Sequence, residues 1–345
     1  MEIYRIGSKI REERIRQKLS QEELSYGICA VSTLSRIETG MQKPGLKMEE
    51  ALLERLGCST ENLVFFASEE EVVKHSLEVD MDFKLMRHEA DVKKEIEEYE
   101  KLISEQGASG NLEKQHYLLV KASYDSYVGG KPSEQCYSML KKAILLTMPD
   151  FKVRRLHGIR LMTLTEISIL NSMAIKLYEM QSMGLAMKYM YFLVEYLERD
   201  NISKDAIVKR YPMLLVNLAM LEAKVRDFRQ VLFLCQKGIR FCKEYGRLMP
   251  LAEFYYYKAV AYAKFGGIRK ALENYEYAIC LCKVSGRNEF AKQIENEYQN
   301  IVKCKHNRTE TQHDQLQDTD PPKKTEEKGP SQPEEEQKTK SVLPV

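Results

Sequence analysis

The 345-residue chain lacks a long apolar run. No stretch reaches the roughly 18 residues that a membrane-spanning helix needs, so we expect no contact with a membrane. The first ten residues carry charges throughout and lack the apolar centre of a secretion signal. Because the formal net charge is only +2, overall charge does not indicate nucleic-acid binding, and any basic surface must be local. These absences favour a cytosolic protein.

Paired cysteines and catalytic motifs are also missing. The eight cysteines form no C-x-x-C pair, and Cys280 and Cys282, two residues apart on a helix, point in different directions. We therefore expect free, mostly buried thiols and no metal site. The chain has no Gly-rich phosphate loop, no H-E-x-x-H and no G-x-S-x-G, and its histidines are isolated. The sequence predicts neither an enzyme nor a bound cofactor.

Strand patterns are absent, since Val and Ile recur at helical rather than alternating spacing, which predicts an all-α protein. Three zones differ in composition. Residues 1–66 hold short helical segments separated by turn signals, and residues 67–305 hold long helical stretches with few Pro or Gly. Residues 306–345 are mainly Glu, Lys, Gln, Thr and Pro. This last zone cannot bury enough apolar surface to offset the entropy of ordering, so we predict a disordered charged tail.

The middle zone contains an internal repeat. The segment from Ala219 aligns without a gap with the segment from Ala259, at an offset of 40 residues. Each unit reads as two antiparallel helices around a tight turn, at 226–227 and at 265–267. The residues that recur are Ala219, Ala223, Lys224, Arg229, Leu232, Ile239, Cys242, Lys243 and Gly246, matched by Ala259, Ala263, Lys264, Arg269, Leu272, Ile279, Cys282, Lys283 and Gly286.

Small and large residues alternate within each unit at the spacing 0, 3, 12, 16, 19. This frame resembles the tetratricopeptide repeat. We expect about five helix pairs between residues 70 and 304, stacked into a curved solenoid because no pair buries its apolar face alone. The frame fits Ala259, Tyr262, Ala271, Tyr275 and Ala278, then Ala174, Leu177, Ala186, Met190 and Leu193, and more loosely Tyr124, Tyr127, Cys136, Leu140 and Ala143.

The first zone has strong local signals for short helices. Ile6 and Ile10 mark one buried face of a first helix, and Ser20 followed by Glu23 has the capping-box spacing. Further helices are predicted over 21–26, 31–39 and 48–56, with a fifth capped by Ser59 or Thr60. Gly27 suits a turn that needs positive φ, and Gly40 is a helix-stop signal.

The apolar residues of this zone predict one small core that leaves helix 31–39 on the surface, where it can enter the major groove of DNA. Ser25 is small where two helices must cross closely. The expected core is Leu24, Ile28, Leu34, Ile37, Leu46, Leu52 and Leu56.

Residues 6–60 resemble the Cro/phage-repressor-like (XRE) helix-turn-helix family, above all in SQEEL (20–24) and STLSRIETG (32–40). The turn at 27–29 is one residue shorter than the phage-type pattern and is similar to that of the Rgg/PlcR group of Gram-positive regulators. Proteins of that group carry a tetratricopeptide-like domain whose concave face binds small peptide pheromones. The resemblance also implies an ion pair between Arg14 and Glu38, with a structural role.

Geometry and resemblance together assign the DNA contacts. The backbone and amide of Gln21 should meet a phosphate, and the start of helix 31–39 should face base edges. Arg36 lies on the same face as Ser32 and can fork onto guanine or onto a phosphate. Alternatively, Gln21 is a plain helix-start residue and Arg36 a solvated charge. The predicted DNA contacts are Gln21, Val31, Ser32, Thr33, Arg36 and Lys43.

The first helices of the pairs should line the inner groove of the solenoid. Asparagine side chains can clamp a peptide's backbone amide, and Met and Tyr would form adaptable apolar pockets. Alternatively, the Met and Tyr side chains belong to the solenoid core, and the asparagines cap neighbouring backbone groups. The predicted groove residues are Asn171, Ile175, Tyr178, Asn217, Met220, Tyr256 and Lys264, with Asn171 and Asn217 as the main peptide contacts.

These features predict a homodimeric transcriptional regulator that reads an inverted-repeat operator in double-stranded DNA and responds to a short signalling peptide. Two helix-turn-helix units about one turn of DNA apart add their contacts, and the repeats supply the dimer interface. Two alternatives stay open. One is a ligand-independent repressor of a mobile element or toxin–antitoxin locus, and the other is a protein-interaction scaffold tethered to DNA.

Overall fold

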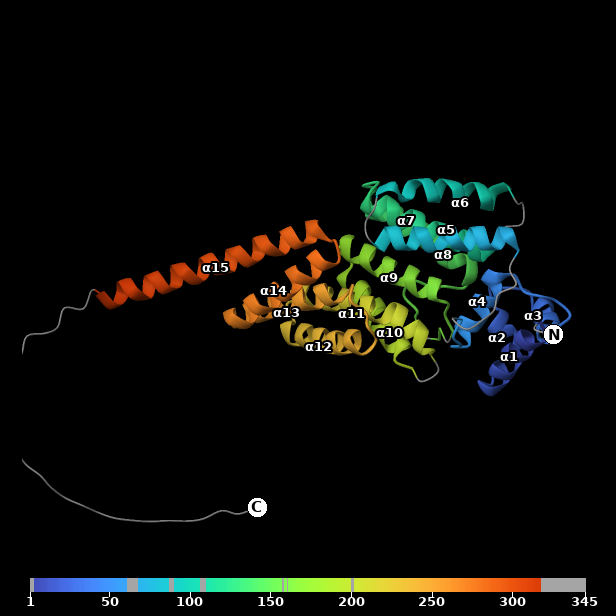
Figure 1. Cartoon of the computed structure of the whole chain (residues 1–345). Helices are drawn as coiled ribbons and strands as arrows, with labels where there is room; N and C mark the ends of the chain where they lie inside the picture. The colour runs from blue at the N-terminus through green and yellow to red at the C-terminus, as the bar shows by residue number, and fades with distance from the viewer. Residues whose placement is uncertain are drawn as a thin grey trace, which may run out of the picture. The chain divides into compact units, whose positions relative to one another are not determined.

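A computed structural model of the chain describes residues 3–60, 68–86, 90–105, 110–156, 158–159, 161–199 and 202–317. Within these ranges the regular structure is helical, apart from one isolated bridge between Lys152 and Arg155 (Figure 1). The predicted all-α class is confirmed. The predicted fifth helix after Ser59 and most of the predicted tail lie outside the described residues.

Four short helices form what we call the N-terminal bundle: α1 (Ile3–Arg16), α2 (Gln21–Ser25), α3 (Val31–Glu38) and α4 (Leu46–Arg55). Five of the seven expected core residues are buried together, and Ile28 packs partly against them. Leu46 was predicted to join this core but does not, because it opens α4 and its N–H bonds Glu71. The buried cluster is Ile10, Leu19, Leu24, Leu34, Ile37, Leu52, Leu53 and Leu56.

Local signals set the helix limits of the bundle. The Ser20 hydroxyl accepts from the N–H of Glu23 at 3.0 Å, and the Glu23 carboxylate accepts from the N–H of Ser20 at 2.7 Å, so the predicted capping box is confirmed. Gly27 has φ +71° and Gly40 has φ +74°, the left-handed conformations that their places in the sequence predicted.

Five helix pairs come next, and each helix contacts the next. The first helices, α5, α7, α9, α11 and α13, also contact one another in succession, as expected on the inner side of a curved array. We call these pairs the repeat array. Its helices are α5 (Glu69–Met86), α6 (Lys93–Glu105), α7 (Asn111–Tyr127), α8 (Ser133–Thr147), α9 (Leu164–Glu179), α10 (Met183–Leu197), α11 (Lys204–Lys224), α12 (Phe228–Glu244), α13 (Leu251–Lys264) and α14 (Ile268–Val284), with a 3-10 turn η1 (Ala90–Val92) after α5.

The repeat frame packs as its residue sizes require. In the last unit the three small positions are fully buried, Tyr275 is 2% exposed and Tyr262 is half-buried. In the unit of α9 and α10 all five positions are buried, whereas Tyr127 in the loosest unit is exposed. Arg226 and Gly266, 40 residues apart, both adopt positive φ in the turns between paired helices. Positions related by the 40-residue offset therefore share the same backbone conformation in this turn.

A last helix, α15 (Asn288–Gln317), packs Ala291 and Ile294 against α13 and α14. The helix continues to Gln317, beyond the boundary at 305 where we expected the tail to begin. The stretch is polar, but Glu, Gln and Lys have good helix propensity, so polarity does not prevent a helix there.

In the part of the chain that the structure describes, no helix is long and apolar enough to cross a membrane, and no group of side chains has the arrangement of a metal site. The cysteines that it describes are free thiols, and four of them are buried. Burial raises the pKa of Cys235 and of Cys242 to about 12, which keeps both thiols protonated.

Candidate nucleic-acid interface

Helix α3 lies at the surface of the N-terminal bundle with one face free. Leu34 and Ile37 point into the core, whereas Val31 is 39% exposed and Ser32 is exposed. Thr33 is half-buried. The opening turn of the helix therefore presents short side chains outward, as a helix that enters the major groove requires.

Two exposed cations extend this face. Arg36 lies one turn after Ser32, and Lys43 lies in the turn after α3. The N–H groups of Met41 and Gln42 both donate to the carbonyl of Arg36, which closes the helix end and fixes the path toward Lys43. Neither cation has an ion-pair partner within 4.0 Å among the described residues, so both charges are available to phosphates or bases.

Gln21 has a different environment from the predicted one. Its amide donates to Oε2 of Glu38 at 2.8 Å, where we expected it to face a phosphate. Arg14 donates to both carboxylate oxygens of Glu38 at 2.6 and 2.8 Å, which confirms the predicted ion pair. Burial raises the pKa of Glu38, but the hydrogen bonds from Arg14 and Gln21 outweigh it and lower that pKa overall. Gln21 thus helps to hold α1, α2 and α3 together.

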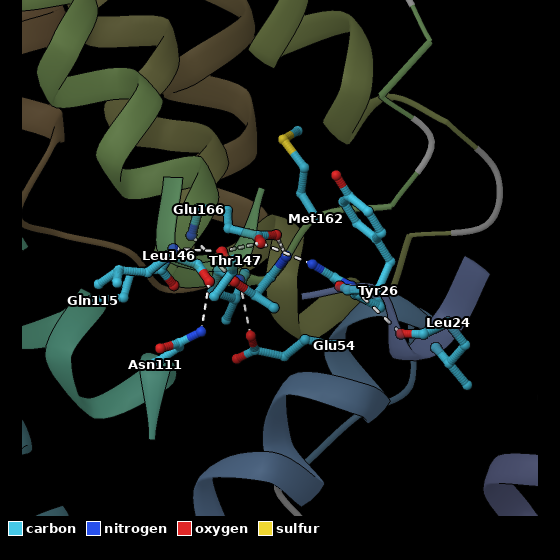
Figure 2. Close-up of polar contacts among 12 residues, drawn as sticks. Leu24, Tyr26, Glu54, Asn111, Gln115, Leu146, Thr147, Met162 and Glu166 are labelled. Atoms are coloured by element: carbon cyan, nitrogen blue, oxygen red, sulfur yellow. Dashed lines mark hydrogen bonds and ion pairs between the residues drawn. The ribbon is translucent and has the colours of Figure 1, made fainter. Parts of the chain in front are cut away.

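The bundle meets the repeat array through Arg55 at the end of α4. Its Nη1 donates to the carbonyls of Leu24 and Tyr26, and its Nη2 donates to Glu166 Oε1 at 2.9 Å (Figure 2). The two charged side chains are only 2% and 0% exposed. Arg55 therefore closes the end of α2 and joins it to α9 at the same time.

Glu166 is the centre of a buried polar network. It completes a capping box at the start of α9, where its carboxylate accepts from the N–H of Thr163 at 2.7 Å. It also accepts from the Thr147 hydroxyl at 2.6 Å, and that hydroxyl accepts from Gln115 at 2.6 Å. Helices α4, α8 and α9 thus meet at one carboxylate, and α7 joins the network through Thr147 (Figure 2).

Two further bonds fix the bundle on the array. Glu54 Oε2 accepts from the N–H of Leu164 at 2.8 Å, and the Tyr26 hydroxyl donates to Asp150 Oδ2 at 2.6 Å. Burial raises the pKa of Glu54 to about 7. We call the contacts made by Tyr26, Glu54, Arg55 and Gly27 the junction.

The short turn at Gly27 lies directly on the end of α8. A Cβ at this position would come within 1.9 Å of the Thr147 carbonyl oxygen. The sequence predicted Gly27 for its positive φ, but the structure adds a second requirement, the close approach of two backbones. The turn that leads into α3 therefore packs directly against the end of α8 in the repeat array.

The two asparagines predicted for the groove come together on adjacent inner helices. Asn217 Nδ2 on α11 donates to Asn171 Oδ1 on α9 at 2.8 Å. Tyr178 and Met220 are half-buried and pack against the core of the array, and so does Ile175. The remaining two predicted residues lie on α13: Tyr256 bonds Glu297 of α15 at 2.9 Å, and Lys264 is exposed at the end of α13.

Sequence reasoning missed the junction. Gly27 carried a local signal for its turn, and Thr163 and Glu166 carried the S/T-x-x-E capping box that marks the start of α9, but neither signal indicates a partner. Arg55 and Glu166 are 111 residues apart, so no spacing in the sequence indicates that they pair.

A helix-turn-helix family model matches residues 10–63. No curated protein sequence matches the chain. Among solved structures, PlcR of Bacillus thuringiensis in complex with the peptide PapR7 and DNA is similar over 84% of this chain and 99% of its own, with 16% identity and a TM-score of 0.51. ComR of Streptococcus thermophilus in complex with DNA and its signalling peptide ComS is similar over 86% of this chain and 99% of its own, with 17% identity and a TM-score of 0.45. The pheromone receptor Rgg2 of Streptococcus dysgalactiae is similar over 86% of this chain and 99% of its own, with 15% identity and a TM-score of 0.43.

The family match identifies the N-terminal bundle as a helix-turn-helix DNA-binding domain of the XRE type. The likeness to PlcR shows a shared fold, a helix-turn-helix followed by a helical repeat domain. The predicted helix-turn-helix domain and the all-helical architecture are confirmed.

Proposed function

We propose that this protein is a dimeric transcriptional regulator that binds an inverted-repeat operator and is controlled by a short peptide in the inner groove of the repeat array. One observation carries the proposal. The bundle that matches the helix-turn-helix family leaves the outer face of α3 exposed and is bonded on its other side to α9, the helix that carries Asn171. We propose a cytosolic location and no catalytic role.

The reading face is supported by what α3 exposes. Val31 and Ser32 are small enough for base edges to approach, and Val31 suits a thymine methyl group. Arg36 supplies the fork that pairs with guanine, while Lys43 binds a phosphate. A single unit makes few base contacts, so two units, one per half-site, add their affinities.

The peptide site is supported by the asparagine pair. Their mutual bond uses one donor of Asn217 and one acceptor site of Asn171, and the other amide atoms can bond a peptide backbone. PlcR, whose fold this chain shares, has been solved with a peptide and DNA bound. In our proposal a peptide lies across α9 and α11, where the two asparagines meet.

Helix α9 offers the coupling between the two sites. Asn171 and Glu166 are five residues apart on α9, roughly 7.5 Å along the helix axis. A peptide that shifts α9 moves the carboxylate that holds Arg55 and therefore the bundle. The peptide changes operator affinity only by its differential affinity for the two arrangements.

The DNA-reading role is tested by binding of the full chain to the upstream region of its own gene. We expect Arg36→Ala to lose about 10- to 100-fold in specific affinity, because a bidentate base contact is worth roughly 1–3 kcal/mol. Arg229→Ala, which removes an exposed cation from α12, is the matched control and should bind as the wild type does. Equal affinity of the two variants would show that Arg36 does not read DNA.

The peptide role is tested with the same duplex, with and without synthetic peptides encoded by short reading frames beside the gene. We expect a peptide to change the operator affinity of the wild type, and Asn217→Ala to bind DNA normally without that response. Lys243→Ala, which removes an exposed side chain from α12, the second helix of its pair, checks that the loss is specific. A wild type that responds to no such peptide contradicts peptide control.

The asparagine bond also favours a second candidate. Since Asn171 and Asn217 satisfy part of each other's hydrogen bonding, the groove is ordered without a ligand, as a ligand-independent repressor would require. In that case Asn217→Ala lowers stability, and operator affinity does not depend on any peptide.

A further inference from the structure

The connection between α8 and α9 carries an unbalanced positive charge. Residues 151–160 read FKVRRLHGIR, with four Lys or Arg and no acid. Lys152, Arg154 and Arg155 are all exposed. Their side chains make no hydrogen bond or ion pair with any residue that the structure describes. We call residues 151–156 and 158–159 the basic loop.

The backbone of the basic loop is held in place by α10 and its end. The Tyr189 hydroxyl donates to the carbonyl of Val153 at 2.9 Å, and Lys188 donates to the carbonyl of Arg154 at 3.0 Å. Arg199 donates to the carbonyl of Ile159 at 3.4 Å. The donors include two further cations, so the bonds that order the loop also add to its positive charge.

The basic loop lies beside the N-terminal bundle. Asp150, just before it, bonds Tyr26, and Leu161, just after it, packs against the bundle core. An open groove of about 700 Å³ separates the two parts, with Lys152 and Arg155 on one wall and α2 on the other. The cations therefore stand next to the helix that precedes α3.

We propose that the basic loop is a second DNA-binding surface, which contacts phosphates flanking the half-site read by α3. The inference rests on the proposed DNA-binding function. Duplex DNA carries one negative charge per roughly 1.7 Å, so cations held rigidly beside a bound half-site face further phosphates without any need for base recognition. The loop adds affinity and orientation, and α3 keeps the sequence preference.

The opposing explanation is local charge balance. Glu22 and Glu23 of α2 border the same groove, and the cations would then serve to neutralise them. The two explanations differ in what the cations do for folding. Neutralisation stabilises the protein without DNA, whereas phosphate contacts matter only when DNA is bound.

The experiment compares the full chain with the triple variant Lys152→Ala/Arg154→Ala/Arg155→Ala. The control is Arg229→Ala/Arg240→Ala/Lys243→Ala, which removes three exposed cations from α12. Binding is measured on the operator alone and on the operator extended by about two helical turns of flanking DNA on each side, over a series of salt concentrations. Thermal unfolding without DNA is measured in parallel.

We expect the triple variant to lose at least about 10-fold in affinity for the flanked duplex, and its plot of log K against log salt to become shallower by about 2–3. The control should match the wild type on both duplexes. The order of preference among operator sequences should be unchanged.

Three outcomes overturn the inference. A triple variant that binds as the control does leaves the loop without a role in DNA binding. A triple variant that unfolds at lower temperature, is rescued by Glu22→Gln and keeps its salt dependence shows local charge balance. A wild type that binds no duplex from its upstream region overturns the proposed function, and the inference with it.

Discussion

The two sides of the N-terminal bundle are built in opposite ways. The side with α3 is exposed and carries cations without ion-pair partners in the described ranges, such as Arg36. The junction side is buried and polar, with Arg55 and Glu166 at 2% and 0% exposure. The contrast shows how a small domain can be available to a partner and still have a defined orientation: hydrogen bonds have direction, whereas an apolar contact tolerates sliding.

The junction is specific rather than strong. Burying two charges costs nearly as much as their attraction returns, and a buried ion pair stabilises little compared with apolar residues of the same shape. Within the described part, Arg55 Nε and Gln115 Oε1 are also buried without a hydrogen-bond partner. A contact of this kind holds one arrangement while keeping the cost of leaving it modest.

The largest effect on the junction is expected from a substitution of Gly27. We expect Gly27→Ala to destabilise the protein by about 4 kcal/mol, because the new Cβ meets the Thr147 carbonyl at 1.9 Å and the bundle must move off α8. Gly130→Ala is the matched control: it has φ +60° but nothing within 4 Å of its Cβ, so it carries the backbone strain alone, about 1 kcal/mol. Chemical denaturation measures both, and equal losses would show that the close approach does not matter.

The next largest effect is expected from the buried pair. Glu166→Ala leaves Arg55 buried without its counter-charge and opens the capping box of α9, at a cost of about 3 kcal/mol. Glu295→Ala removes one partner of an exposed ion pair with Lys283, and should cost less than about 1 kcal/mol.

A double variant sharpens the test. Arg55→Met with Glu166→Leu replaces both charges by apolar side chains and should recover much of the stability, while the orientation of the bundle becomes less defined. Calorimetry measures the stability, and proteolysis between the bundle and the array reports on the orientation. If the double variant is no more stable than Glu166→Ala, the cost does not arise from the unpaired charge.

The smallest effect concerns pH. Burial raises the pKa of Glu54 from its ordinary value to about 7, so the folded state holds this proton more tightly than the unfolded state. The resulting stability is fully present below the unfolded pKa and is lost as the pH rises through about 7. Because Gln is uncharged at every pH, Glu54→Gln should keep this stability, and its free energy of unfolding at pH 8 should exceed that of the wild type by about 1 kcal/mol.

Glu71 provides the control of opposite sign for this pH profile. Burial raises its pKa, but hydrogen bonds from Ser68 and from the N–H of Leu46 outweigh this and lower it overall. Its contribution is present above the unfolded pKa and is lost as the pH falls. Glu71→Gln should therefore reduce stability near pH 8. A Glu54→Gln profile that parallels the wild type from pH 5 to pH 8 would contradict the assignment of Glu54. A Glu71→Gln profile that stays parallel to the wild type as the pH falls below about 5 would contradict the assignment of Glu71.

The sequence predicted the bundle and the repeat pairs because their signals are local. Ser20 and Glu23 form their capping box within one turn, and the frame at Ala271, Tyr275 and Ala278 depends on helical period alone. The Asn171–Asn217 pair was predicted as two groove residues, since each occupies a comparable place in its own unit. Features that depend on residue spacing within one helix pair could thus be predicted directly.

Partners brought together by the tertiary fold could not be predicted in this way. Arg55 and Glu166 show no common pattern, and the amide of Gln21 bonds Glu38 because α2 and α3 cross at that point. Leu46 was expected in the core from its apolar character, but it opens α4, where its N–H bonds Glu71 of α5, and it is not part of the core cluster. Each of these differences arises from the angle between helices, which no residue spacing records.

The 40-residue offset has a consequence for how such a chain can change length. The junction involves α4 and the helices α7, α8 and α9, whereas the duplicated units are α11 with α12 and α13 with α14. Each unit packs chiefly on its neighbours, so the repeat array can gain a helix pair without disturbing the others. A third copy of the unit, inserted after Gly286, would lengthen the inner groove by one helix pair. The contacts of the helix-turn-helix domain at the junction would stay unchanged.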